Sequence, residues 1–221
     1  RNVIRLKENS QVVVVDGLGT AYRGTLSGKS GNKETIVKIQ NIVRNYGEPF
    51  VKVTLAAGLS EGYKFDSVVQ QGTEIGVSSF IPVITEKSKI KLGDAAKAAT
   101  RIKRLERVAQ SAMKQCRRSF CPTIASFVKF DHFINTVAKD SLKLMFHPEP
   151  AGSSFDRKED IGSVRNIIVL VGPESGFSEA ELEKAVASGF KTVTMGARWM
   201  RAETAAPVAC ALVLGWFGEL S

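Results

Sequence analysis

Cysteine and histidine are scarce in this chain of 221 residues. It holds three cysteines and two histidines, and an odd number of cysteines without regular spacing does not predict a disulfide framework. No zinc-binding spacing links the histidines to the cysteines, so we expect no metal site and interpret Cys116, Cys121 and Cys210 as buried free thiols. The chain also lacks a secretory signal and an apolar run long enough to span a membrane, which predicts a soluble cytoplasmic protein.

Acidic residues are outnumbered, and the basic excess is concentrated in one segment. The chain carries 31 Lys and Arg against 22 Asp and Glu, a net charge of +9. Residues 87–129 hold twelve of the basic residues and only two acidic ones. A helix face exposed to solvent would explain such a run. The concentration of the charge in one segment instead favours a nucleic-acid groove, because Lys and Arg that bind phosphates release the counterions of the nucleic acid, which favours binding.

The first part of the sequence is typical of β structure. Short apolar runs at 11–15, 21–26, 34–40 and 50–55 are separated by Gly, Ser and Asn clusters, which predicts a small barrel or sandwich. We place the domain boundary near Ala57-Gly58, giving domains at 1–57 and 58–221. The chain opens at Arg1 rather than at a methionine, so we expect that residues precede it and that the first domain is truncated.

The second part alternates strands with helices. Strands are predicted at 80–84, 141–146, 166–171 and 190–194, and helices at 65–75, 97–114, 178–187 and 205–217. Ser178 and Glu181 form a capping-box pattern, and Pro207 is expected in the first turn of the last helix. This alternation predicts an α/β domain with a mostly parallel sheet and helices on both faces.

Ligands in open α/β sheets bind beyond the carboxyl ends of the strands. Three predicted loops start at such ends, namely 147–149, 172–176 and 195–201. The glycines of the second loop let the backbone approach a ligand closely, either a phosphate or a group such as adenine that backbone amides and carbonyls recognise. An ordinary tight turn explains the same residues, and the loop lacks the Lys-Ser/Thr of a P-loop.

The third loop contains two arginines around an apolar pair. Trp199 and Met200 lie between Arg198 and Arg201, which predicts that part of the loop is buried. A buried arginine needs a paired anion or a hydrogen-bonding partner. Either Glu203 or a substrate fills that role.

Several segments resemble the RsmE-type family, the 16S ribosomal RNA uracil-N3 methyltransferases of the SPOUT class. Residues 172–181 resemble the signature G-P-E-G-G-(F/L)-S-x-x-E, and 195–205 resemble L-G-x-R-I-L-R-x-E-T-A. Residues 71–77 are similar to K-x-T-E-L-G-V, 112–122 to A-x-x-Q-x-x-R-x-x-x-P, and 3–5 to V-L-R. The chain departs from the pattern in Ser175 for a glycine, in Leu105 for a frequent tryptophan, and in Pro207.

The resemblance implies a PUA-like, RNA-binding β-barrel at residues 1–57 and a SPOUT-type domain with a trefoil knot at 58–221. It also implies a homodimer, S-adenosylmethionine as cofactor and small-subunit ribosomal RNA as substrate. The residues expected around the cofactor are His147, Leu170, Gly172, Glu174, Gly176, Met195, Gly196 and Met200. Those expected to contact RNA are Arg5, Arg104, Arg117 and Arg118.

Methyl transfer to a uracil nitrogen requires alignment of the reactants and removal of a proton. We expect Arg201 to stabilise the resulting negative charge and Glu203 to act as the base, although the two side chains pairing with each other is an alternative. Three other functions stay open. They are methylation of another RNA base or of ribose, RNA binding without catalysis, and a nucleotide-phosphate enzyme.

Overall fold

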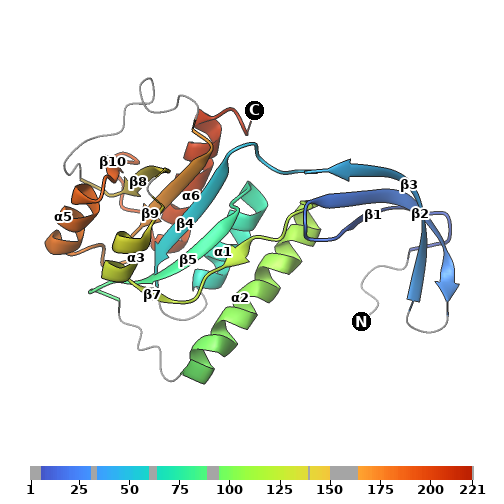
Figure 1. Cartoon of the computed structure of the whole chain (residues 1–221), viewed down its shortest axis with the longest axis horizontal. Helices are drawn as coiled ribbons and strands as arrows, with labels where there is room; N and C mark the ends of the chain where they lie inside the picture. The colour runs from blue at the N-terminus through green and yellow to red at the C-terminus, as the bar shows by residue number, and fades with distance from the viewer. Residues whose placement is uncertain are drawn as a thin grey trace. The chain divides into compact units, whose positions relative to one another are not determined.

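The computed structural model describes residues 6–30, 34–59, 64–88, 95–138, 140–149 and 164–220 (Figure 1). The chain divides into two compact units. The first unit comprises residues 1–48 and 113–121, and the second comprises 49–112 and 122–221. Arg5 lies outside the described residues, so its predicted role in RNA binding is not addressed by the structure.

The first unit contains a three-stranded antiparallel sheet in the order β1-β2-β3. Its strands are β1 (Gln11–Val15), β2 (Thr20–Ser30) and β3 (Glu34–Arg44). The turn after β1 is closed by Asp16, whose carboxylate accepts hydrogen bonds from the backbone N–H groups of Leu18 at 2.7 Å and Thr20 at 3.0 Å. These hydrogen bonds lower the pKa of Asp16, because they favour its ionised form.

A buried ion pair stabilises the same unit. The Arg118 side chain is only 3% exposed, and its guanidinium donates to Oε2 of Glu48 from Nε at 3.1 Å and from Nη2 at 2.7 Å. The other carboxylate oxygen of Glu48 accepts from the backbone N–H of Phe120 at 2.8 Å. The hydrogen bonds of Glu48 therefore connect the two segments of this unit, 1–48 and 113–121.

The predicted domain boundary at Ala57-Gly58 is wrong. Strand β4 (Lys52–Gly58) pairs in parallel with β5 and β9, so it belongs to the second unit, which starts at Pro49. A short apolar strand has the same pattern in an antiparallel barrel and in a parallel sheet, and the sequence alone therefore did not separate the two. The sequence also gave no sign that 113–121 groups with the first unit.

The second unit contains a parallel sheet in the order β10-β8-β9-β4-β5-β6, with β7 paired to β5. The remaining strands are β5 (Ser79–Ile84), β6 (Thr123–Ile124), β7 (Val128–Lys129), β8 (Leu142–Phe146), β9 (Asn166–Val171) and β10 (Lys191–Val193). The predicted parallel sheet is thus confirmed. The strands predicted at 80–84, 141–146, 166–171 and 190–194 lie within one residue of the observed ends, β4 ends three residues later than predicted, and β6 and β7 were not predicted.

Helices cover both faces of this sheet (Figure 1). One hydrophobic cluster joins the sheet to α1 (Lys64–Ile75), α2 (Ala95–Cys116) and α6 (Ala202–Trp216), and a second joins it to α3 (Phe130–Thr136) and α5 (Glu179–Ala187). Alternate residues of β9 face opposite clusters, with Val169 and Val171 in the first and Ile168 and Leu170 in the second. No helix of the described residues is long and apolar enough to cross a membrane.

Helix α6 starts three residues earlier than predicted. Pro207 is therefore the sixth helical residue and lies beyond the first turn, contrary to expectation. Because proline has no N–H, the backbone carbonyl of Glu203 cannot receive the usual helical hydrogen bond from position 207. Cys210 is fully buried in this helix, whereas Cys116 and Cys121 are half-buried free thiols.

Candidate functional site

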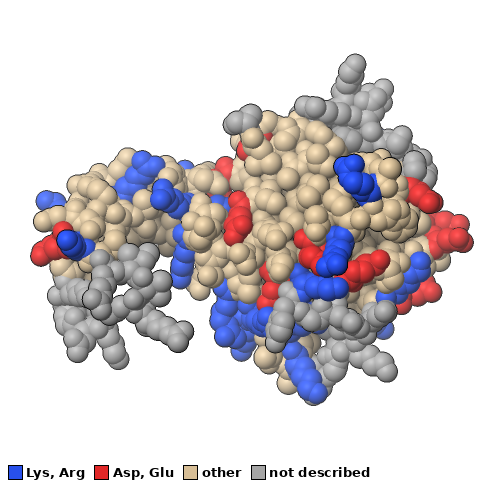
Figure 2. Space-filling model, turned by 180° about the vertical axis from the view of Figure 1, so that it is seen from behind, with Lys and Arg blue, Asp and Glu red and all other residues tan. Residues whose placement is uncertain are grey.

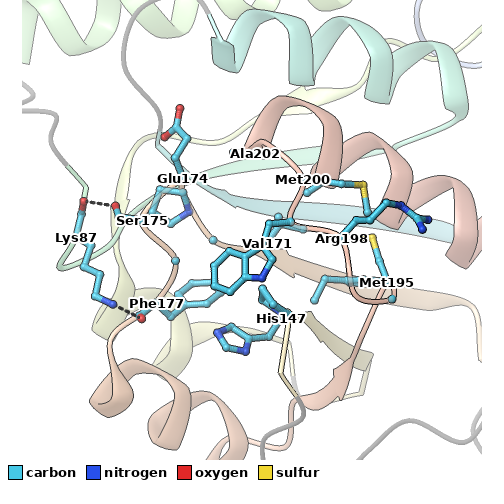
Figure 3. A pocket seen from close by; sticks show the side chains of 18 residues that line it. Lys87, His147, Val171, Glu174, Ser175, Phe177, Met195, Arg198, Met200 and Ala202 are labelled. Carbon is cyan, nitrogen blue, oxygen red and sulfur yellow. Dashed lines mark hydrogen bonds between the residues drawn. The ribbon is translucent and has the colours of Figure 1, made fainter.

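Three loops converge on one pocket at the carboxyl edge of the parallel sheet (Figure 3). The loops follow β8, β9 and β10, which are neighbours in the order β10-β8-β9. They are the three loops that the sequence placed at strand ends. The pocket is lined by Lys87, Phe146, His147, Pro148, Val171, Gly172, Pro173, Glu174, Ser175, Gly176, Phe177, Met195, Gly196, Arg198, Trp199, Met200, Ala202 and Ala205.

The loop after β9 is held close to the sheet by glycine. A Cβ atom on Gly58, at the end of β4, would lie 2.3 Å from Cδ of Pro173 and 2.5 Å from its backbone nitrogen. Gly176 adopts a φ of +68°, which closes the loop with a hydrogen bond from its N–H to the carbonyl of Pro173 at 2.8 Å. The chain then enters α5 through the predicted capping box of Ser178 and Glu181.

The loop after β10 presents both backbone and apolar side chains. Gly196 has a φ of +85°, and a Cβ atom there would meet nothing within 4 Å. Met195 and Met200 are half-buried and pack against the hydrophobic core. Trp199, by contrast, is 79% exposed, so the part of the loop that was expected to be buried contains the half-buried Met200 and not Trp199.

A fourth segment, which sequence reasoning missed, borders the pocket at Lys87 (Figure 3). The ammonium group of Lys87 donates to the carbonyl of Phe177 at 2.8 Å, and the hydroxyl of Ser175 donates to the carbonyl of Lys87 at 2.9 Å. Ser175 stands where the motif has glycine, and its hydroxyl therefore fixes the loop against residues 86–88. No local signal predicts a contact between segments so far apart in the sequence.

Seven of the eight predicted cofactor-binding residues line the pocket. These are His147, Gly172, Glu174, Gly176, Met195, Gly196 and Met200. Leu170 does not, because it is fully buried and faces the cluster around α3 and α5. Its neighbour Val171 points to the opposite face and lines the pocket instead.

Arg201 and Glu203 flank the pocket rather than line it. Their neighbours Met200 and Ala202 belong to the lining, while Arg201 is exposed and forms the N-cap of α6. The ion pairs of the described residues do not include one between Arg201 and Glu203. Oε2 of Glu203 is buried and accepts no hydrogen bond from the described part of the chain.

Lys64 pairs with the glycine loop in the neighbourhood of Glu203. Its ammonium group forms a salt bridge with Glu174, and that hydrogen bond is the main reason why the pKa of Lys64 is raised. Lys64 also lies close enough to Glu203 and Arg201 to feel both charges. The Lys64–Glu174 ion pair therefore lies beside the pocket, and the charges of Glu203 and Arg201 act on it.

The predicted RNA-contacting arginines have different environments. Arg118 is buried and paired with Glu48, so it stabilises the first unit and is not available to a phosphate. Arg104 is partly exposed and pairs with Asp66 at the start of α1. Arg117 is exposed and adopts a φ of +63°, which is uncommon for a residue with a side chain.

Several cations of the basic segment 87–129 are exposed on α2. On α2, Lys97, Lys103, Arg107 and Lys114 are exposed. Figure 2 shows Lys and Arg side chains gathered in the region of this helix. The concentration of positive charge seen in the sequence is therefore also a concentration in space.

Comparison with known proteins agrees with this arrangement. The family model of the RNA methyltransferase domain matches residues 47–214, which is most of the chain. The chain is 30% identical to a ribosomal RNA small subunit methyltransferase E of Buchnera aphidicola, over 83% of this chain and 72% of that protein. It is 28% identical to the protein of the same name from Synechocystis, over 96% of this chain and 68% of that one.

A solved structure of the same kind superimposes on nearly the whole chain. It is the ribosomal RNA small subunit methyltransferase E of Neisseria gonorrhoeae bound to S-adenosyl methionine, with a TM-score of 0.82 and 27% identity. The match covers 97% of this chain and 86% of that one. The resemblance based on the loop motifs is confirmed, and the chain belongs to the RNA methyltransferase domain family, among the ribosomal RNA small subunit methyltransferases E.

Proposed function

We propose that this chain transfers a methyl group from S-adenosylmethionine to N3 of a uridine in small-subunit (16S) ribosomal RNA. The observation that carries the proposal is the convergence of three strand-end loops on one pocket that contains seven of the eight residues expected around the cofactor. The Neisseria relative, which was solved with that cofactor, supports the same assignment.

The pocket residues fit an adenosyl group chemically. Gly172, Gly176 and Gly196 bring the backbone to the pocket without a side chain, and backbone groups there other than the Gly176 N–H can recognise the edge of adenine. Met195 and Met200 offer polarisable apolar surface to its faces. Glu174 also belongs to the pocket lining, and its carboxylate is paired with Lys64.

When bound, S-adenosylmethionine would supply an electrophilic methyl group on a sulfonium, whose transfer to N3 forms an N–C bond, breaks the C–S bond and leaves a neutral thioether. The residues of the chain must hold the acceptor in line and remove the N3 proton. We assign proton removal to Glu203, because its Oε2 receives no hydrogen bond from the described residues and is therefore available to accept the N3 proton. Arg201 supplies a cation for the charge that develops on the imide oxygens.

These two roles predict a loss of turnover without a loss of cofactor binding. We expect Glu203→Gln and Arg201→Ala each to lower kcat by about 100-fold or more. Their affinity for S-adenosylmethionine stays within about threefold of the wild type, since neither residue lines the pocket. Glu183→Gln, an exposed change on α5, is the control. A variant with unchanged kcat would remove that residue from the mechanism.

The assignment of the cofactor pocket is tested with a matched pair of glycine variants. Gly196 and Gly189 have nearly the same φ, +85° and +86°, and a Cβ atom at either would meet nothing within 4 Å. Only Gly196 lines the pocket. By calorimetry we expect Gly196→Trp to abolish binding of S-adenosylmethionine and Gly189→Trp to preserve it. Equal affinities would exclude the loop after β10 from the pocket.

The substrate is tested by mass spectrometry of ribosomal RNA nucleosides from cells that lack the chain. Loss of 3-methyluridine, restored by the wild-type gene and not by Glu203→Gln, is the expected result. Loss of a different methylated nucleoside would assign another base or ribose as the target. No change in any methylated nucleoside would contradict the proposed function.

RNA recognition is assigned to the first unit and to the basic helix. We propose that the sheet β1-β2-β3 is part of a PUA-like barrel and that Arg104 and Arg117 contact RNA phosphates, supported by the exposed cations of α2.

We further propose a cytoplasmic homodimer whose second unit contains a trefoil knot. Light scattering in solution tests the dimer, and a monomeric mass would contradict it.

A further inference from the structure

Trp199 is an exposed indole at the pocket that the proposed mechanism does not use. It is 79% exposed although it belongs to the pocket lining. In the described residues, the ring–ring and cation–ring contacts do not involve it. Large apolar side chains left open to water beside a site are typical of surfaces that bind a ligand.

The position of Trp199 in the loop keeps the indole at the rim. The next residue, Met200, is half-buried and anchored in the core cluster, so the loop is fixed on one side of the tryptophan. Arg198 on the other side is exposed and also lines the pocket. The signature that residues 195–205 resemble has isoleucine where this chain has Trp199.

The cations among the pocket-lining residues distinguish between two possible ligands of the indole. Arg198 and Lys87 both line the pocket, and Figure 3 shows them with the three loops around the cavity. S-adenosylmethionine carries a net positive charge, so these cations do not favour the cofactor beside the indole. RNA carries a phosphate for each base, and arginine and lysine bind phosphate well.

We propose that Trp199 is the stacking platform for the RNA base that receives the methyl group, an inference that rests on the proposed function. A base that leaves its stack in RNA loses the contact of its π-face, and an aromatic side chain at the site restores that contact. Trp199 is thus a positioning residue, which holds the acceptor base at the rim of the pocket while the cofactor occupies the interior.

The experiment measures methyl transfer to small ribosomal subunits purified from cells that lack the chain. We expect Trp199→Ala to raise KM for the RNA substrate about tenfold, because stacking on an aromatic ring is worth that order of affinity. Trp199→Phe keeps KM within about threefold, and Trp199→Ile, which is apolar but has no π-face, behaves like alanine. In all three variants the change in kcat and in the affinity for S-adenosylmethionine is smaller than the change in KM for the RNA substrate.

A spectroscopic measurement tests the contact without relying on turnover. Addition of a uridine-containing RNA oligonucleotide is expected to quench the tryptophan emission of the wild type and to leave that of Trp199→Phe unchanged. The inference would be overturned if Trp199→Ala left KM for the RNA substrate unchanged, or if Trp199→Ile had the KM of the wild type. It would also be overturned if the variants weakened only the binding of S-adenosylmethionine. A wild type that methylates no RNA, yet is quenched by it through Trp199, would overturn the proposed function and leave the base contact intact.

Discussion

Glu181 hydrogen bonds to the backbone of Glu86 across 95 positions of sequence. Oε1 of Glu181 accepts the N–H of Glu86 at 2.8 Å, while Oε2 accepts the N–H of Ser178 at 2.9 Å. The carboxylate is 5% exposed. One side chain therefore caps α5 and holds the segment that contains Lys87 against the glycine loop of the pocket.

Removal of this carboxylate is expected to destabilise the second unit. Glu181→Ala leaves two backbone N–H groups without their acceptor, and we expect a loss of about 2–3 kcal/mol in the free energy of unfolding. Glu183→Ala, an exposed change on the same helix, is expected to stay within about 0.5 kcal/mol. Urea denaturation of both variants checks this, and equal stabilities would contradict the role of Glu181.

Gly58 is expected to be intolerant of even one methyl group. The Cβ atom of Gly58→Ala would lie 2.3 Å from Pro173, so the loop after β9 must move. We expect a loss of about 1–3 kcal/mol from overpacking and at least a tenfold weaker affinity for S-adenosylmethionine.

Gly215→Ala on α6 is the matched control for this change. A Cβ atom there would meet nothing within 4 Å, and alanine is favoured over glycine in a helix by about 0.5–1 kcal/mol. Calorimetric titration and denaturation of both variants test the prediction. Unchanged cofactor binding in Gly58→Ala would mean that the position of Pro173 does not define the pocket.

The location of the site was predictable because it follows from the geometry of parallel strands. The carboxyl ends of β8, β9 and β10 lie along one edge, so loops recognised separately in the sequence had to come together. The capping box at Ser178 and Glu181 was equally readable, since it depends on residues three apart.

What could not be predicted depends on the face of a strand or on distant contacts. Residues 166–171 are apolar on both faces, so the pattern did not reveal that Val171 faces the pocket while Leu170 faces α3 and α5. The partners of Lys87 and of Arg118 lie 90 and 70 positions away in the sequence. Such contacts are fixed by the tertiary fold and leave no local pattern.

The Arg118–Glu48 pair is expected to matter for stability rather than for RNA binding. Glu48→Ala leaves the buried guanidinium without this carboxylate, and the loss of a buried partner costs about 3–5 kcal/mol. Glu106→Ala, at an exposed position on α2, is expected to change stability by less than about 0.5 kcal/mol. A Glu48 variant as stable as the control would contradict the structural role of the pair.

The three cysteines are expected to differ in reactivity. Burial raises the pKa of the Cys210 thiol above its ordinary value of 9.0, because the thiolate is disfavoured inside α6. At pH 8 a thiol reagent should therefore modify the half-buried Cys116 and Cys121 in the native chain, and Cys210 only after denaturation.

Because its folded pKa is above the unfolded value, Cys210 adds stability below pH 9 that is lost as the pH rises further. Cys210→Ala should weaken this decline, and modification of all three thiols in the native state would contradict the packing of α6.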